Sequence, residues 1–148
     1  MKIERAAAEH VGAWAELRAE LWPGETPEQH RADVAETFLS GTGEAAAFVC
    51  LGDDGTVIGI AEAALRKDYV NGCETSPVLF LEGIYVRPEH RRSGVGKLLC
   101  GAVARWGCSL GCQEFASDAA ADNADSLRFH AALGFDETER VVFFRRVL

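Results

Sequence analysis

The sequence lacks any apolar run near the roughly 20 residues that a membrane-spanning helix needs, so we expect no membrane partner. It also lacks the apolar stretch of a signal peptide behind Met1–Arg5, and we therefore expect a cytoplasmic protein. Basic residues are few: 15 Lys and Arg stand against 23 Asp and Glu, which gives a formal net charge of −8. This balance argues against nucleic-acid binding and favours a cationic small molecule, which an acidic cleft would concentrate.

Cysteine is present in an odd number, five, and the residues are scattered, as is typical of reduced thiols inside a cell. Cys108 and Cys112 stand four positions apart, but no second pair of Cys or His completes a zinc site. We therefore predict no metal site.

No repeat, linker or low-complexity tract divides the chain, so residues 1–148 are predicted to form a single domain. Hydrophobic residues make up 48% of the sequence, which is normal for a globular domain and excludes a disordered or fibrous chain.

Apolar periodicity and turn residues predict an α/β (α+β) fold. Its sheet is mixed and mostly antiparallel, with helices on both faces and one parallel strand pair, because the unit 78–117 is a strand–helix–strand crossover. Thr26 and Gln29 form a capping box with Pro27 at the first helical position. The expected elements are a strand at Lys2–Arg5, helices at Glu9–Trp22 and Thr26–Ser40, a hairpin of Ala45–Leu51 and Val57–Ala64, a strand at Val78–Val86, a helix after the turn Arg91–Gly96, a strand at Gln113–Ser117, a helix at Ala124–Leu133 and a final strand pair within Phe135–Leu148.

The segment Val78–Val86 is apolar on both faces, which is typical of a central strand in a covered sheet. Strict alternation puts Leu79, Leu81 and Tyr85 on one face and Phe80, Ile84 and Val86 on the other. Glu82 then falls beside Phe80 and Ile84, where a buried carboxylate is costly unless it is paired.

The turn Arg91–Gly96 joins the end of this strand to the start of a helix, where free backbone N–H groups and the helix dipole favour an anion. Gly94 and Gly96 would let a pyrophosphate approach the backbone closely, and Arg91 and Arg92 add positive charge. The alternative is a solvated basic turn before an ordinary helix.

Three groups of residues carry a resemblance to a known family. They are the run Leu81-Glu82-Gly83-Ile84-Tyr85-Val86, the pattern Arg91-x-x-Gly94-x-Gly96, and Asn123, Ser126, His130 and Gly134-Phe135. Together they resemble the GNAT superfamily of acetyl-CoA-dependent N-acetyltransferases. Trp22, the segment 69–78, Asp118 and the run 130–135 narrow the resemblance to the aminoglycoside 6'-N-acetyltransferases.

The resemblance implies acetyl-CoA as co-substrate, a cationic aminoglycoside as acceptor, direct attack within a ternary complex, antibiotic resistance and a homodimer. It places Trp22, Tyr69 and Glu139 near the acceptor. Each also has a plain structural reading, respectively as a packing residue, a loop aromatic and a solvated charge.

Acetyl transfer to an amine requires a carboxylate that binds the ammonium and takes its proton, directly or through water. Glu82 and Asp118, at neighbouring strand ends, are the candidates for binding and catalysis. The alternatives are an ion pair with an arginine for Glu82 and a turn acid for Asp118.

On the donor side, the backbone of Ile84, Tyr85 and Val86 would hydrogen-bond the pantetheine arm, and the Val86 N–H would stabilise the oxyanion. His130 stands where many relatives have a tyrosine acid, so it either donates a proton or packs beside the coenzyme. Asn123 would touch the pantetheine or thioester region of the coenzyme, and it is equally expected as a helix cap, a role that does not exclude the first. The remaining predicted coenzyme contacts are Arg91, Arg92, Ser93, Gly94, Val95, Gly96 and Ser126.

Two rival functions stay open. The same fold could acetylate a peptide amine, a polyamine or another small amine. A non-catalytic module that binds acyl-CoA or an aminoglycoside is the rival from another class.

Overall fold

A computed structural model describes residues 1–148. Five strands form one sheet in the order β1-β2-β3-β4-β5; neighbours are antiparallel except for the parallel pair β4–β5. The strands are β1 (Lys2–Arg5), β2 (Ala45–Leu51), β3 (Val57–Arg66), β4 (Val78–Val86) and β5 (Phe115–Ser117). The α-helices are α1 (Val11–Leu21), α2 (Pro27–Val34), α3 (Val95–Ser109) and α4 (Ala124–Ala132). The predicted fold class is confirmed.

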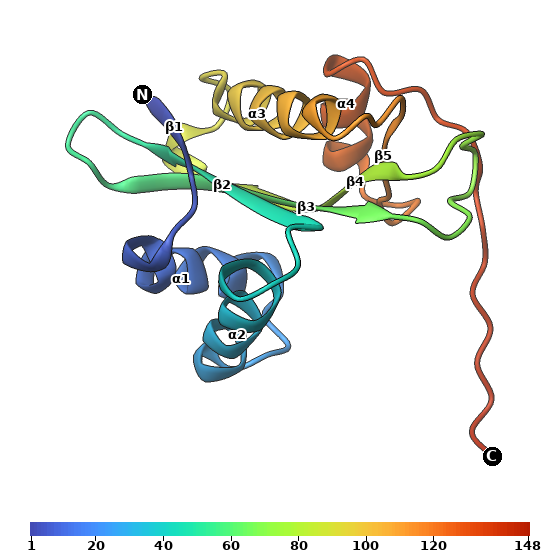
Figure 1. The fold of residues 1–148 in the computed structure, drawn as a ribbon, viewed down its shortest axis with the longest axis horizontal. Coiled ribbons are helices and arrows are strands. Elements are labelled where there is room, and N and C mark those ends of the chain that lie inside the picture. Colours follow the sequence, from blue (N-terminus) through green and yellow to red (C-terminus); the bar gives the residue numbers. More distant parts are fainter.

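Helices cover both faces of the sheet: α1 and α2 lie on one side, and α3 and α4 lie on the other (Figure 1). Two apolar cores result. Trp14 and Leu17 of α1, both fully buried, pack against β2 and β3. On the opposite face Leu99 and Val103 of α3, also fully buried, pack against β3 and β4.

The predicted capping box is present at the start of α2. The Gln29 N–H donates to Thr26 Oγ1 at 3.2 Å, the Thr26 N–H donates to Gln29 Oε1 at 2.7 Å, and Pro27 occupies the first turn. The helix predicted to run to Ser40 changes at its end into a π-helical segment, Ala35–Leu39.

A β-bulge in β4 corrects the predicted alternation of its faces. Gly83 pairs with Glu62 and Leu81 pairs with Ala63, so Glu82 is an extra residue in the ladder. Because two residues of β4 oppose one of β3, the alternation restarts after Glu82. Ile84 and Val86 therefore join Leu79 and Leu81 in the core beneath α3, whereas Tyr85 joins the core beneath α1.

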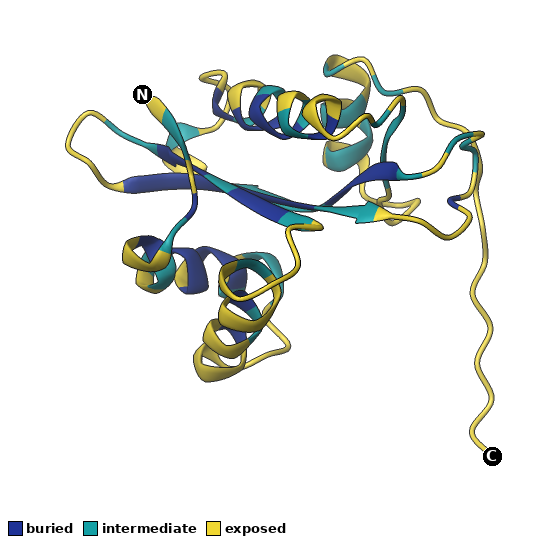
Figure 2. Cartoon of the chain, in the orientation of Figure 1, coloured by how far each residue is buried: buried dark blue, intermediate teal, exposed yellow.

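The strand pair predicted within Phe135–Leu148 is wrong. Residues 135–148 hold no strand, and 139–148 are exposed throughout (Figure 2). Phe143 and Phe144 are 91% and 93% exposed. The segment has strand-forming composition, but a strand also needs an edge with which to pair, and the chain leaves this tail extended away from its own sheet (Figure 1).

All five cysteines are free, and burial raises the pKa of the Cys100 thiol to about 11. No cluster of three or more His, Cys, Asp or Glu side chains could hold a metal ion. None of the helices combines the length and apolar character that a bilayer span requires.

Candidate active site

The two parallel strands separate near the middle of β4. Pairing between β4 and β5 covers only Leu79–Leu81 and Phe115–Ser117, while β4 continues to Val86. Residues 84–86 therefore have β3 on one side and no strand on the other. Such an open edge offers backbone N–H and C=O groups to an extended ligand.

The turn Arg91–Gly96 lies where this open edge ends. Gly94 caps α3 with φ +89°, and no side chain bonds to the free N–H groups of the first turn. Arg91 is anchored to the end of β4: its Nε donates to the Val86 carbonyl at 2.9 Å, and its guanidinium lies 5.2 Å from the Tyr85 ring centre. The turn thus presents free donors and positive charge beside the open edge.

Gly96 has a second reason to be glycine. A Cβ at this position would lie 2.7 Å from Cε2 of Phe129 on α4, whereas one at Gly94 would meet nothing within 4 Å. Close packing of α3 on α4 therefore requires a glycine at position 96, whether or not a phosphate group approaches the backbone there.

Glu82, the bulge residue, is paired with an arginine. Nε and Nη2 of Arg66 donate to its carboxylate at 2.9–3.1 Å, and the same guanidinium stacks 3.5 Å from the centre of the Phe80 ring. Both side chains are partly exposed, 43% for Arg66 and 33% for Glu82. The structure thus contains the ion pair that was the alternative reading of Glu82, and the carboxylate remains reachable from solvent.

Trp22, although distant in the sequence, packs against the residue that follows Glu82 in β4. A Cβ on Gly83, the neighbour of Glu82, would lie 2.5 Å from Cη2 of the Trp22 indole. Trp22 also lines a pocket of about 610 Å³ together with Arg18 and the turn 23–25, in which Glu25 is half exposed. An indole wall beside carboxylates is suited to a cationic sugar.

The loop before β4 and the chain after α4 are brought together. The Asn71 side-chain amide donates to Glu139 Oε2 at 3.0 Å, and a Cβ on Gly72 would lie 2.2 Å from Oγ1 of Thr138. Tyr69 in the same loop is 76% exposed. Asp118 follows β5 directly and is exposed, and no hydrogen bond or ion pair holds its side chain.

Residues 13–135 match the profile of the acetyltransferase (GNAT) family. The chain belongs to this family. It is 51% identical over 140 residues to aminoglycoside N(6')-acetyltransferase type 1 of Serratia marcescens, covering 95% of this chain and 94% of that protein. It is 47% identical over 146 residues to the protein of the same name from Salmonella typhimurium, covering 99% of each.

The structure of this GNAT acetyltransferase is also similar to a solved structure. That solved structure is AAC(6')-Iy in complex with the bisubstrate analogue CoA-S-monomethyl-acetylneamine, with a TM-score of 0.92 and 47% identity. The match covers 99% of this chain and 98% of that one.

His130 of this acetyltransferase is held by two serines and two aromatic rings. Its Nδ1 lies 2.7 Å from the Ser126 carbonyl, which can only accept, so Nδ1 carries the proton. In the neutral ring Nε2, 2.8 Å from Ser117 Oγ, is then the acceptor of that hydroxyl. The ring also packs edge-on against Phe129 and Phe135. In this tautomer the nitrogen that faces Ser117 has no proton to donate.

Asn123 caps α4, as one of its two predicted roles requires: its Oδ1 accepts from the Ser126 N–H at 3.1 Å. Ser93 bonds locally as well, since its hydroxyl donates to the His90 carbonyl. The Asn123 contact stabilises the start of α4, and the Ser93 contact lies within the chain that leads into α3.

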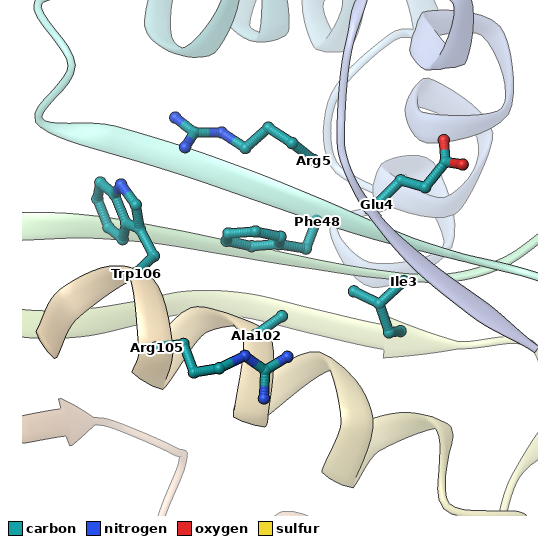
Figure 3. Close-up of a pocket in the computed structure, with 7 residues that line it drawn as sticks. All are labelled: Ile3, Glu4, Arg5, Phe48, Ala102, Arg105 and Trp106. Carbon is teal, nitrogen blue, oxygen red and sulfur yellow. The ribbon is translucent and has the colours of Figure 1, made fainter. Parts of the chain in front are cut away.

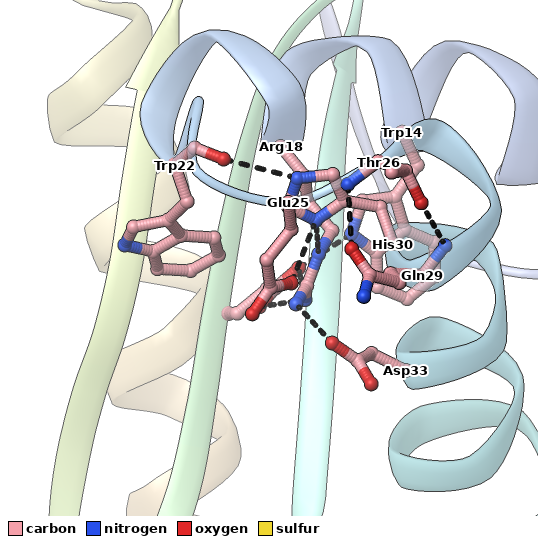
Figure 4. A network of polar contacts seen from close by, with 9 residues as sticks. Trp14, Arg18, Trp22, Glu25, Thr26, Gln29, His30 and Asp33 are labelled. Atoms are coloured by element: carbon pink, nitrogen blue, oxygen red, sulfur yellow. Dashed lines mark hydrogen bonds and ion pairs between the residues drawn. The ribbon is translucent and has the colours of Figure 1, made fainter.

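Sequence reasoning missed a buried polar network behind the acetyltransferase's indole wall (Figure 4). Nη1 of Arg18 donates to both carboxylate oxygens of Glu62 at 2.7 Å, and Trp14 Nε1 donates to one of them at 2.6 Å. Burial raises the pKa of Glu62, and the charge of Arg18 and the indole N–H oppose that rise. The single charge in the otherwise apolar stretch 57–64, Glu62, was the available signal.

A second pocket, of about 390 Å³, lies between α3 and the β1–β2 edge of this acetyltransferase (Figure 3). Phe48 and Trp106 line it together with Arg5, whose guanidinium lies 5.7 and 5.6 Å from the two ring centres. None of the predicted site residues borders this pocket.

Proposed function

We propose that this protein is an aminoglycoside 6'-N-acetyltransferase, which transfers the acetyl group of acetyl-CoA to an amine of the antibiotic and so confers resistance. The observation that carries the proposal is the meeting of two features in β4. Its open edge at Ile84–Val86 suits the donor, and its bulge presents Glu82 beside Trp22 for a cationic acceptor. Full-length relatives with this activity in their names, 47–51% identical, support it.

The reaction is a direct attack within a ternary complex. The neutral amine nitrogen attacks the thioester carbonyl, the C–N bond forms, and the C–S bond breaks as coenzyme A thiolate leaves. The backbone N–H of Val86 stabilises the oxyanion on the open edge. The amine's proton passes to a carboxylate, directly or through water, and then to the thiolate or to solvent.

Glu82 is the first candidate for binding the ammonium and taking its proton. Because Arg66 occupies its carboxylate, the acceptor's ammonium replaces or shares that contact. Asp118, which no protein group engages, is the second acid. Tyr69 and Glu139 are further candidates for acceptor contacts, and Asn71, two residues after Tyr69, donates to Glu139.

The donor site comprises the open edge and the turn that follows it. The free N–H groups at the start of α3, together with Arg91 and Arg92, hold the pyrophosphate, with Ser93, Val95 and Gly96 in the same turn. Asn123 and Ser126 at the start of α4 border the pantetheine arm. His130 packs beside the coenzyme rather than acting as the acid, because in the neutral ring its one proton, on Nδ1, is donated to the Ser126 carbonyl.

A matched pair of antibiotics tests the acceptor. Neomycin and paromomycin differ by an amino or a hydroxyl group at the 6' position, so the wild type should release thiol from acetyl-CoA with neomycin and far more slowly with paromomycin. Equal rates would refute 6' selectivity. Faster turnover of spermidine or a lysine peptide would favour the rival amine acetyltransferases, and no thiol release with any amine would favour a binding module.

Variants test the two acids. Glu82→Gln and Asp118→Asn should each lower kcat/KM for neomycin by roughly one hundredfold while leaving the KM for acetyl-CoA unchanged. Full activity in both variants would remove these residues from the mechanism.

We further propose a homodimer, supported by the exposed tail: Val141–Leu148 is rich in Val and Phe, extended, and uncovered by its own chain (Figure 2). A second copy would cover it. Phe143→Glu/Phe144→Glu should shift sedimentation toward the monomer, and Arg145→Glu/Arg146→Glu is the matched control. A monomeric wild type would refute the proposal. Five free thiols support action in the cytoplasm, a reducing compartment.

A further inference from the structure

We propose that Arg18 is a positioning residue for the acceptor: together with Glu62 and His30 it fixes the Trp22 indole as a rigid wall of the acceptor pocket. This inference rests on the proposed function in one respect, namely that the acceptor binds beside Trp22.

The network is buried and fully bonded. Arg18 is 8% exposed, Glu62 2% and His30 fully buried, and no buried side-chain polar atom of the chain lacks a hydrogen-bond partner. Besides Glu62, Arg18 engages His30, whose Nδ1 accepts from Arg18 Nε at 3.2 Å, and Asp33, 3.6 Å from Nη2. Every polar edge of the guanidinium therefore has a partner, which fixes its plane.

The orientation of that plane determines where the indole lies. The guanidinium carbon of Arg18 lies 4.9 Å from the centre of the Trp22 ring, and the far edge of the ring contacts Gly83. His30 holds the backbone of the same residue: Nδ1 is an acceptor, so Nε2 carries the proton and donates to the Trp22 carbonyl at 3.1 Å. Figure 4 shows Arg18 between Trp22 and His30.

Stability alone does not account for this arrangement. Buried ion pairs are often matched or exceeded in stability by apolar side chains of similar volume. Helix α1 already has Trp14 and Leu17 fully buried in the core. The contacts of Arg18 and His30 converge instead on Trp22, which lines the 610 Å³ pocket and packs against Gly83, the chain neighbour of Glu82. A displaced indole would misplace the acceptor relative to that carboxylate.

Two variants move Trp22 from opposite sides. Arg18→Met/Glu62→Met removes the guanidinium together with its counter-charge, so no buried charge is left unpaired. Gly83→Ala leaves the ion pair intact and pushes the ring from its far edge, where the new Cβ would lie 2.5 Å from Cη2. Gly12→Ala on α1, where a Cβ meets nothing within 4 Å, is the matched glycine control. Leu99→Ala in the opposite core is the control for lost stability.

Both variants should raise the KM for neomycin roughly tenfold or more and leave the KM for acetyl-CoA within about twofold of the wild type. In a Trp106→Phe background the remaining tryptophans are Trp22 and the fully buried Trp14, so acrylamide quenching of fluorescence reports on Trp22. This quenching should be stronger in both variants than in either control.

Unchanged neomycin KM in Gly83→Ala, parallel rises in both KM values, or unchanged quenching would overturn the proposal. If the double variant does not fold, Gly83→Ala decides alone. If the wild type acetylates no aminoglycoside but quenching still rises, the proposed function fails while the positioning of Trp22 stands.

Discussion

Replacing Arg66 by methionine should strengthen acceptor binding and weaken the fold at once. The guanidinium makes two kinds of contact, an ion pair with Glu82 at 2.9 Å and a stack on Phe80 at 3.5 Å. Both partners of the ion pair are about one third exposed or more, so the pair contributes only about 0.5–1 kcal/mol. The stack of the partly exposed Arg66 on the buried Phe80 ring adds a similar amount. Methionine keeps an apolar stem over Phe80, so Arg66→Met should lower the free energy of unfolding by about 1 kcal/mol.

The same 0.5–1 kcal/mol opposes an acceptor whose ammonium has to displace Arg66 from Glu82. Removing Arg66 should therefore lower the dissociation constant for neomycin roughly two- to fivefold. Titration calorimetry with coenzyme A present measures the constant directly, and urea denaturation measures the stability.

Lys67→Met is the charge-matched control, because Lys67 pairs with Glu44 and not with Glu82. In a Glu82→Gln background, Arg66→Met should have no effect on binding. Weaker neomycin binding in Arg66→Met, or an effect equal to that of Lys67→Met, would refute the competition between Arg66 and the acceptor.

Three further predictions concern stability, each measured by urea denaturation. Glu62→Gln should cost about 3–5 kcal/mol because it removes the buried counter-charge of Arg18 and leaves only the half-exposed Asp33, 3.6 Å away; a smaller loss than in Leu99→Ala would contradict this. Gly107→Ala should cost about 1 kcal/mol, since its Cβ would lie 2.5 Å from Leu79 Cδ2, whereas Gly101→Ala on the same helix should stabilise. The Thr75 hydroxyl and two backbone N–H groups hold the pKa of Glu114 below its ordinary 4.5, so its contribution is complete above pH 4.5 and is lost as the pH falls through the lowered value. Glu114→Gln should thus lose less stability than the wild type on acidification; parallel curves would show that these contacts do not matter.

Local signals predicted most of the fold because they depend on neighbouring residues alone. The capping box at Thr26, the cap at Asn123 and the strand Val78–Val86 lie where the sequence placed them. The open strand edge and the turn beside it also follow from one crossover unit, 78–117. The family resemblance is confirmed as well.

Features that depend on partners distant in the sequence could not be predicted. The bulge at Glu82 arises from the register between β3 and β4, which strict alternation within one strand cannot reveal. The ion pair of Arg18 with Glu62 spans 44 positions. An arginine partner of Glu82 was one of the alternatives, but its identity as Arg66, 16 positions away, depends on the pairing of β3 with β4. The tail was predicted as a strand pair because its composition favours strands, but composition does not supply an edge.

Glu82 has no partner in the pairing of β4 with β3. With this one residue deleted, Leu81 and Gly83 would be consecutive, and every inward and outward position of β4 would keep the side of the sheet that it has now. A shortened protein of 147 residues would thus retain a more regular hairpin while losing the acid on which turnover is proposed to depend. Such a deletion would distinguish the requirements of folding from those of catalysis better than a point substitution, because it removes both the carboxylate and the β-bulge that exposes it.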